Sequence, residues 1–481
     1  MIEAKPIIEE ISIHCPPQEV FEIFKDEKNS VFLDSGMDHE RSGKFSFITA
    51  DPFLIFRSKG NRIEVIKQGK LEILKENPFN ALKNIFYNYK VKKIDTLKTF
   101  TAGAIGYFGY DLGWQLEKLP RIAVDDLKLN DIYLGFYDWA LVFDNNNKRC
   151  YITSTGLPEK DPNLRQVLAK ERIKNVRNKL RTIEGYDSDD FSNLIDTPLL
   201  FSNFKKTSYL QAVERVKKHI TAGDIYQANL SQRFMTELKI KPYELYKKLR
   251  TINPAPFASF LNFEDLVILS ASPERFLRIS DRNVITRPIK GTRRRGDTAI
   301  EDEKLKEELL SSEKDRAELI MIIDLERNDL GKVCDYGSVR VKELITLESY
   351  ATVFHLVSTI RGKLYEDKNH IDCIKACFPG GSITGAPKIR AMEILEELEP
   401  TKRGIYTGSI GYLGFNGETD LNIVIRTMIV KNDMVYFHVG GGIVADSIPE
   451  NEYQETLIKA KALIDALYFK NGQRVSTAQV A

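Results

Sequence analysis

The chain has 481 residues, of which 42% are hydrophobic and 29% are charged. This length and balance indicate a globular protein with about two or three domains, or with two large lobes. The 70 basic and 68 acidic residues leave a formal charge of only +2, which argues against a polyanion such as nucleic acid as a partner.

The cysteines and the apolar segments indicate the compartment. Five cysteines, an odd number in a large chain, favour a reducing environment with free thiols. Cys373 and Cys377 lack the second Cys or His pair that a zinc site needs. The first ten residues contain no signal-like apolar run, and no window approaches the roughly 20 apolar residues of a membrane span. We therefore expect a cytoplasmic protein without a membrane partner.

Strand patterns dominate the first part of the chain. Alternating apolar residues predict strands between 44 and 75, a helix over 78–89, and strands over 102–108, 133–143 and 150–153. From 157 to 203 the sequence becomes charged and polar, and we place a boundary there. The expected organisation is an N-terminal lobe over 1–195, a second lobe over 196–470 and a polar tail over 471–481.

The second part mixes helices with strands. The expected elements are a helix over 207–222, a strand over 226–234, a hairpin of 266–271 with 276–279, a strand ending at 291, a long helix over 299–328, a glycine-rich loop with a helix over 378–400, a meander of strands over 408–415, 421–430 and 434–444, and a last helix over 449–468. The pattern is α+β with antiparallel sheets.

Two pairs of acidic residues lie on expected helices. Asp315 and Glu318 are three residues apart on one helix face, and Glu452 and Glu455 repeat this spacing in the last helix. Like charges at that spacing repel, and each pair alone is typical of a solvated face. If the helices meet, the four carboxylates suit Mg²⁺. We assign Glu318 and Glu455 to the metal directly, and Asp315 and Glu452 to its water shell.

Three further features indicate an anionic ligand. Lys290 is predicted at a strand end, where a lysine is usually a solvated edge residue, but the motifs around it suggest that it faces a buried site. The glycines at 440–442 and 380–381 either form bulges or let backbone N–H groups approach an anion. Arg426, predicted inside an apolar strand, needs an acidic partner or a ligand carboxylate. The loop lacks the Lys and Ser/Thr of a nucleotide-binding motif, so a dicarboxylate is the favoured ligand.

The motifs resemble those of the chorismate-utilising enzymes, which include anthranilate synthase component I, aminodeoxychorismate synthase component I, and the isochorismate and salicylate synthases. The resemblance extends over residues 204–467, and it is weaker at residues 32–36 and 45–52. It implies a two-lobed antiparallel β-sandwich core flanked by helices. The matching segments are Asp324 to Gly331, His355 to Ile360, Phe378 to Lys388, Gly440 to Asp446 and Tyr453 to Thr456.

Two positions sort the chemistry within this family. The isochorismate and salicylate synthases have a lysine base where this chain has Gln227, so the resemblance implies that water is not activated here. Anthranilate synthases usually have alanine in the motif Pro-Ile-Ala-Gly-Thr, where this chain has Lys290 and Thr292 in Pro-Ile-Lys-Gly-Thr. The lysine implies the aminodeoxychorismate branch, which makes 4-amino-4-deoxychorismate for p-aminobenzoate and folate synthesis. Anthranilate synthase component I and a catalytically silent tryptophan-binding subunit are the alternatives.

The resemblance also implies roles for single residues. Lys290 would attack the ring of chorismate while Glu274 protonates the leaving hydroxyl group, with Mg²⁺ on the ring carboxylate. Substrate contacts are implied for Gln227, Thr292, Thr384, Tyr406, Arg426, Lys459 and the backbone amides of Gly440, Gly441 and Gly442, and His355 would steady the substrate. A separate glutamine amidotransferase subunit would supply ammonia in a heterodimer. Ser35 matches a tryptophan-binding region, although a plain β-turn also explains it.

Overall fold

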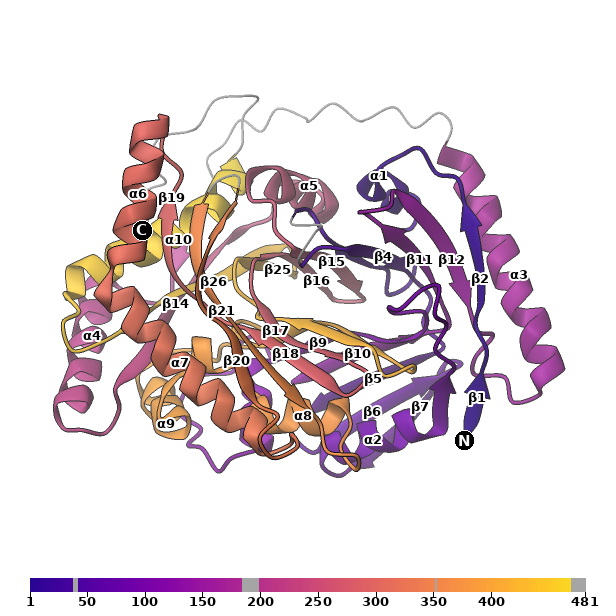
Figure 1. The fold of residues 1–481 in the computed structure, drawn as a ribbon, viewed down its shortest axis with the longest axis horizontal. Coiled ribbons are helices and arrows are strands. Elements are labelled where there is room, and N and C mark those ends of the chain that lie inside the picture. The colour runs from indigo at the N-terminus through magenta and orange to yellow at the C-terminus, as the bar shows by residue number, and fades with distance from the viewer. Residues whose placement is uncertain (38–41, 184–198, 351–352, 469–481) are drawn as a thin grey trace.

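The computed structural model describes residues 1–37, 42–183, 199–350 and 353–468. The predicted domain boundary at 195 and the predicted tail at 471–481 lie outside these residues. Most of the described strands belong to two 12-stranded sheets, and every pairing within each sheet is antiparallel. Figure 1 shows both sheets crossing the middle of the molecule, with helices on the outside.

The first sheet runs from the C-terminal half of the chain into the N-terminal half. Its order is β19 (Ile289–Arg294), β21 (Val353–Lys363), β18 (Asn283–Arg287), β17 (Arg275–Ser280), β24 (Thr419–Asn422), β23 (Ser409–Gly414), β9 (Gly103–Phe108), β10 (Ile132–Tyr137), β5 (Leu54–Lys59), β6 (Arg62–Lys67) and β7 (Lys70–Lys75), with β20 (Arg340–Ser349) also paired with β21.

The second sheet is built in the same way. Its order is β13 (Phe201–Ser202), β14 (Gln227–Glu237), β26 (Met434–Ile443), β25 (Thr427–Lys431), β16 (Leu266–Ser272), β15 (Phe257–Phe263), β3 (Val31–Asp34), β4 (Phe45–Thr49), β11 (Trp139–Asp144), β12 (Arg149–Ser154) and β2 (Ile7–Ile11), with β22 (Gly385–Ala386) paired with β14. A small parallel pair joins β1 (Ile2–Ala4) and β8 (Tyr89–Val91).

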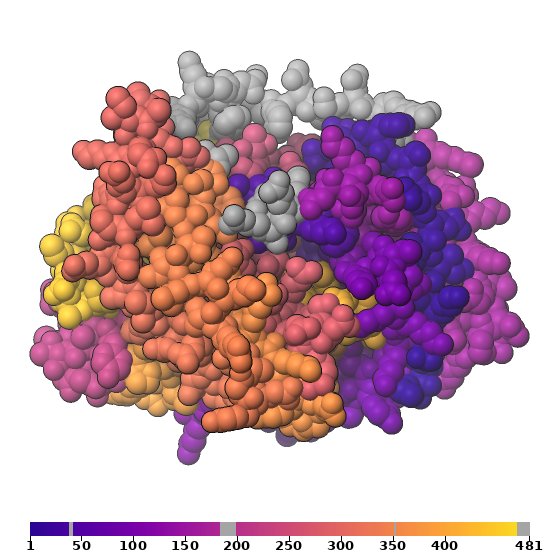
Figure 2. Space-filling model, in the orientation of Figure 1, coloured from indigo at the N-terminus to yellow at the C-terminus, as the bar shows by residue number. Residues whose placement is uncertain are grey.

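A shared apolar core holds the two sheets together. It contains Ile105 and Ile410 from the first sheet and Leu261 and Ile429 from the second, all nearly inaccessible to solvent. The predicted α+β class and β-sandwich core are therefore confirmed. Each predicted domain contributes one block of neighbouring strands to each sheet, so both domains share both sheets, and the boundary between the domains remains a prediction. Figure 2 shows the two parts of the chain meeting across one face, with most of the residues before 183 on the right.

Helices cover the outer faces of the sheets, and the predicted last helix has the expected bounds. The helices are α1 (Pro17–Phe21), α2 (Pro78–Asn88), α3 (Pro162–Leu180), α4 (Lys206–Thr221), α5 (Pro242–Ile252), α6 (Ala299–Ser311), α7 (Glu313–Gly331), α8 (His370–Cys377), α9 (Lys388–Leu398) and α10 (Pro449–Tyr468). Helices α6 and α7 contact β19, whereas α10 contacts β26. No helix among the described residues is long and apolar enough to span a membrane.

Two expected elements are wrong because the chain passes from one sheet to the other. The predicted hairpin of 266–279 is absent, since β16 lies in the second sheet and β17 in the first. The predicted strand over 421–430 is likewise divided into β24 and β25, which belong to different sheets. Arg426 lies in the second crossing and has a φ of 50°, a left-handed conformation that interrupts a strand.

Two other boundaries also differ from expectation. Gly291 does not end a strand, because β19 continues to Arg294 along β21, with a bulge at Gly291 and a φ of 73° there. Pro288 separates β18 from β19. The predicted long helix over 299–328 is broken at Ser312, which has an extended backbone and caps α7 by accepting a hydrogen bond from the Asp315 N–H.

Candidate active site

The two crossings between the sheets lie beside each other and form the floor of the candidate site. The Ile423 N–H donates to the Glu274 carbonyl at 3.0 Å, and the Ala271 N–H donates to the Arg426 carbonyl at 3.1 Å. Because both segments leave their sheets here, their side chains are free of the alternating in-and-out pattern of a strand. Glu274 and Arg426 are thereby brought to one region from positions about 150 residues apart in sequence.

Lys290 is a partly buried amine with acidic groups around it. It lies on β19 directly before the bulge, and its nearest charged neighbours include Glu318, Glu274 and Lys459. Burial lowers the pKa of Lys290, and Lys459 adds to this effect, together outweighing the nearby carboxylates. The Lys290 amine makes no hydrogen bond or ion pair with the described residues. The site therefore favours the neutral amine more than water does.

Glu274 is a buried carboxyl group next to the lysine strand. It is 4% exposed, and its Oε1 accepts a hydrogen bond from the Ile289 N–H at 3.3 Å. Burial raises the pKa of Glu274, while Ser382 and Lys290 oppose the shift. A carboxyl group in this environment holds its proton to higher pH and can donate it to a leaving group.

The acidic pairs of α7 and α10 converge on the glycines of β26. A Cβ added at Gly441 would lie 3.3 Å from Glu452 Oε2 and 3.4 Å from Glu455 Oε1. A Cβ at Gly442 would lie 3.6 Å from Glu318 Oε2. Helices α7 and α10 therefore meet across the glycines of β26. A metal site shared by the two acidic pairs requires this convergence. Both helices lie on the left of Figure 1.

This acidic cluster fits an ion that takes few protein ligands. No group of three or more Asp, Glu, His or Cys side chains among the described residues forms a ready-made metal cage. Mg²⁺ commonly takes only one or two carboxylates and fills its other positions with water and substrate oxygens. Glu318 and Glu455 suit that role, and Glu452 Oε2 is a buried oxygen without a hydrogen-bond partner among the described residues.

The four acids nevertheless have different local environments. Burial raises the pKa of Glu318. For Glu455 burial acts in the same direction, but the ammonium groups of Lys459, 2.7 Å away, Lys314 and Lys290 together outweigh it and lower the pKa. Glu452 accepts a hydrogen bond from the Ser447 hydroxyl at 2.6 Å. Asp315 instead faces Arg293, at 3.3 Å. Its assignment to the water shell of a metal therefore remains the least supported of the four.

The glycine strand is open on one side. Gly440, Gly441 and Gly442 pair with β14, whereas β25 on the other side pairs only with residues 434–437 of β26. Lys459 donates to the Gly440 carbonyl at 2.9 Å. Gln227, at the start of β14, is 1% exposed, and its Oε1 has no hydrogen-bond partner among the described residues. Such a buried, unpaired oxygen is available to a ligand.

His355 and Arg426 line a pocket of about 310 Å³ beside the sheet crossings. His355 Nδ1 is 2.8 Å from the hydroxyl of Thr292, and burial with the nearby Arg426 charge lowers the pKa of His355 to about 4. The imidazole is therefore neutral near pH 7. Arg426 donates to Asn253 Oδ1 at 3.1 Å but forms no ion pair with a described carboxylate. The expectation that a ligand carboxylate pairs with Arg426 remains a prediction.

Thr384 and Tyr406 are buried at the rear of the site. The Thr384 hydroxyl donates to the Gly380 carbonyl at 3.0 Å, so it already has a partner within the glycine-rich loop. The Tyr406 ring stacks on His438 with centroids 5.0 Å apart. Burial raises the pKa of Tyr406 to about 12, so its hydroxyl keeps its proton and can donate to an anion.

A fully paired ion pair holds the segment that carries Tyr406. Arg403 and Glu399 form two hydrogen bonds of 2.7 Å. Arg403 also donates to the Asn229 and Ile383 carbonyls, and Glu399 accepts from the N–H and hydroxyl of Ser231. These contacts join α9, β14 and the glycine-rich loop.

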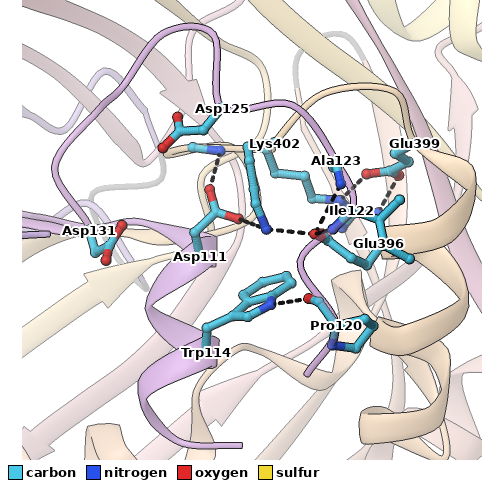
Figure 3. A network of polar contacts seen from close by, with 12 residues as sticks. Asp111, Trp114, Pro120, Ile122, Ala123, Asp125, Asp131, Glu396, Glu399 and Lys402 are labelled. Atoms are coloured by element: carbon cyan, nitrogen blue, oxygen red, sulfur yellow. Dashed lines mark hydrogen bonds and ion pairs between the residues drawn. The ribbon is translucent and has the colours of Figure 1, made fainter. Parts of the chain in front are cut away.

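A second network supports the same segment from the N-terminal half. Lys402 bonds Glu396 at 2.7 Å and lies 3.9 Å from the centre of the Trp114 ring (Figure 3). The Gly404 N–H donates to Asp111 at 3.0 Å. Residues 111 and 114 belong to a 3₁₀ helix (Tyr110–Gln115), so the first half of the chain helps to position the second.

Sequence reasoning missed two charged residues near the loop, one partly buried and one buried. The Lys388 ammonium donates to Asp329 at 2.6 Å and to the Cys377 and Pro379 carbonyls at 2.9 and 2.7 Å, which fixes the glycine-rich loop to α7. Glu326 occupies a core-facing position of α7. The signal was a charged residue inside an apolar stripe of a helix, which indicates a buried, paired group.

Ser35 lies some way along the second sheet, in a different pocket. Its hydroxyl donates to the Phe45 carbonyl at 2.7 Å, and it lines a pocket with residues from both sheets. The lining includes Phe47, Tyr412 and Arg278. An aromatic and polar lining of this kind suits an aromatic amino acid, but tryptophan binding remains a prediction.

Comparison with known proteins supplies the remaining observations. A family model described as "chorismate binding enzyme" matches residues 31–465. The chain is 38% identical to anthranilate synthase component 1 of Acetivibrio thermocellus over 94% of this chain and 92% of that protein. It is also 38% identical to aminodeoxychorismate synthase component 1 of Bacillus subtilis (strain 168), over 94% of each. The crystal structure of anthranilate synthase component I from Streptococcus pneumoniae TIGR4 superposes with a TM-score of 0.77 at 32% identity, over 89% of this chain and 94% of that one.

Proposed function

The chain belongs to the family of chorismate binding enzymes, and we propose that it converts chorismate and ammonia to 4-amino-4-deoxychorismate, as component I of an aminodeoxychorismate synthase. Relatives of equal identity carry this name and that of anthranilate synthase component 1, so overall similarity does not decide between them. The choice between these two activities rests on Lys290. A partly buried amine without a partner among the described residues, facing a buried acid, is arranged as a nucleophile.

The proposed reaction has two displacements. In the first, the neutral Lys290 amine attacks the ring carbon next to the one that bears the carboxylate, both double bonds of the diene shift, and the 4-hydroxyl group leaves as water with the proton of Glu274. The attached nitrogen then returns a proton to Glu274. In the second, ammonia attacks the 4-position, both double bonds shift back, and the Lys290 nitrogen leaves as a neutral amine with the proton of Glu274, which the new ammonium group then restores. The net change is loss of water and gain of ammonia.

Other residues of the chain bind and orient the substrate. Arg426 and Tyr406 offer donors to the enolpyruvyl carboxylate, and so do the amides along the open side of Gly440 to Gly442. Neutral His355, held by Thr292, steadies the ring. Gln227 takes the place of a water-activating base and presents an amide instead. Lys459 and the loop at Thr384 lie toward the ring acids.

Mg²⁺, if held by Glu318 and Glu455 with Glu452 and Asp315 in its water shell, would neutralise the ring carboxylate and draw electron density from the diene. Its binding would also place a cation near the Lys290 amine, and a nearby cation lowers the pKa of an amine further.

Ammonia would come from a separate glutamine amidotransferase subunit in a heterodimer. This proposal agrees with the burial of Cys150, Cys334, Cys373 and Cys377, since burial raises the pKa of Cys150 and Cys334 to about 12 and disfavours a thiolate nucleophile there. The cavity at Ser35 is the proposed tryptophan site. Titration calorimetry with tryptophan, comparing wild type with Ser35→Trp to fill the cavity, tests this assignment.

Product identification tests the proposed function. Purified chain, chorismate, Mg²⁺ and an ammonium salt should yield a product that retains the enolpyruvyl group, detected by mass spectrometry. Fluorescent anthranilate formed without an added lyase would show anthranilate synthase activity and overturn the assignment. Absence of Mg²⁺-dependent chorismate binding in calorimetry would instead indicate a silent subunit.

A further inference from the structure

Glu326 is a second buried carboxyl group behind the Lys290 site, and the proposed reaction does not use it. It lies on the buried face of α7, in a row with Leu319, Ile322, Ile323 and Leu330. An apolar residue is expected at such a position, because burying a carboxylate costs free energy unless a cation compensates for it. A glutamate at this position therefore requires an explanation.

Among the described residues, no cation forms an ion pair with Glu326. Its Oε2 accepts a hydrogen bond from the Thr286 hydroxyl at 2.8 Å. The groups that face it are Glu274 from the sheet crossing, Asp329 on α7 and Lys388 on α9. Lys388 is already bound to Asp329 at 2.6 Å and to two backbone carbonyls. Burial raises the pKa of Glu326 to about 8, and both acidic neighbours add to this effect.

Glu326 and Glu274 hold the same short segment of chain. Thr286 binds Glu326, and the Ile289 N–H donates to Glu274 Oε1 at 3.3 Å. Pro288 lies between them and has no N–H of its own. Lys290 follows Ile289 directly in the sequence. The two carboxyl groups thus fix the strand on both sides of the proline, one residue before the amine.

We propose that Glu326 is a positioning residue that works in its protonated form: it holds Thr286, and with it the strand that presents Lys290, without placing a negative charge beside Glu274. The importance of this role for turnover rests on the proposed function. The protonated state and its effect on Lys290 do not, since both can be measured without chorismate.

The first experiment measures unfolding in denaturant from pH 5 to 8 for wild type, Glu326→Gln and the control Glu397→Gln, which changes an exposed glutamate of α9. Glutamine resembles the protonated acid but does not titrate. Because the Glu326 carboxyl ionises near pH 4.5 in the unfolded chain, wild type should lose stability as the pH rises toward 8. Over this range the unfolding constant of wild type should rise about 10²- to 10³-fold more than that of Glu326→Gln. The control should follow wild type, and parallel curves for wild type and Glu326→Gln would overturn the proposal.

The second experiment measures the position of the amine. Labelling of Lys290 by a small amine-reactive reagent, read by peptide mass spectrometry, should proceed at the wild-type rate in Glu326→Gln at pH 7. It should change several-fold in Glu326→Ala and in Thr286→Val, which each remove the hydrogen bond. Unchanged labelling in both of these variants would show that Glu326 does not position Lys290.

Turnover then links the residue to the proposed function. Glu326→Gln should keep kcat at pH 7 within about 3-fold of wild type and exceed wild type above pH 8, whereas Glu326→Ala should lose about 10-fold or more in kcat at every pH. Equal losses in both variants at pH 7 would show that the ionised form is needed. If wild type forms no aminated product, the proposed function fails, and the first two experiments still decide the role of Glu326.

Discussion

Two buried clusters of charged groups lie beside β14, and they differ in whether their charges are paired. Around Arg403 and Glu399, each charged group has several hydrogen bonds, and the arginine donates to both carboxylate oxygens. Around Lys290, the amine and the Glu318 carboxylate have no hydrogen bond or ion pair with the described residues. Arg426 has only an uncharged partner among them, Asn253.

This difference separates a cluster that stabilises the fold from a cluster that can take part in a reaction. A buried charge without a partner raises the free energy of the folded state, so a paired cluster can serve stability, whereas an unpaired one is retained only if a ligand completes it. The shifted pKa values agree with this division, because burial dominates the shifts of Lys290, Glu274 and Glu318. Four predictions test the contrast, beginning with the largest expected effect.

Replacing Lys290 should remove activity without loss of stability. Lys290→Ala removes the proposed nucleophile, and we expect turnover of chorismate with ammonia to fall by roughly 10⁴-fold. Stability should stay the same or rise, since a desolvated amine is removed. Rapid-mixing or end-point assays by mass spectrometry measure the first, and thermal unfolding measures the second. Unchanged turnover would exclude the covalent route.

Replacing the paired arginine should have the reverse effect. Arg403→Met leaves Glu399 buried without its partner, and the unfolding free energy should fall by about 4 kcal/mol. Arg426→Met is the matched control from the unpaired cluster and should cost less than about 1 kcal/mol, while weakening substrate binding. Denaturant titration distinguishes the two. Equal losses of stability would remove the contrast between the clusters.

The neutral histidine of the site should make the protein sensitive to acid. The folded pKa of His355 is lowered to about 4, so the unfolded chain, with a pKa near 6.5, gains a proton first as the pH falls. Stability from this residue is therefore present above pH 6.5 and is lost toward pH 4. Between pH 7 and pH 5, the unfolding free energy of His355→Gln should fall by about 2 kcal/mol less than that of wild type. His219→Gln, a partly exposed histidine paired with Asp224, is the control.

Removing one carboxylate of the acidic pairs on α7 and α10 should weaken the response to metal. In Glu455→Gln, the Mg²⁺ concentration for half-maximal turnover should rise by about 10-fold or more. Glu450→Gln changes an exposed glutamate on the same helix and should behave as wild type. Calorimetry with Mg²⁺ and chorismate provides a readout that does not depend on turnover. No change in Glu455→Gln would place the ion elsewhere.

Local patterns predicted the helices and the antiparallel pairing of the strands well. The predicted last helix has the bounds of α10, and the predicted break between the strands over 408–415 and 421–430 separates β23 from β24. Patterns failed where the chain changes sheet. The segments 266–279 and 421–430 have the alternation of hairpins or strands, yet each crosses between layers, because alternation reports burial of a face and not which sheet buries it.

The acidic pairs, the glycine strand and Lys290 could each be named from residue type and spacing, because helix periodicity and glycine geometry act within a few residues. Their convergence could not be derived in this way, since it depends on α7 and α10 meeting across β26 from positions more than 100 residues apart in sequence. The same holds for Glu326, whose protonation depends on a buried environment built from four separate elements. Sequence alone therefore determined the chemical inventory of this protein, and tertiary structure decided which charges are paired, because desolvation and partner geometry exist only in the folded chain.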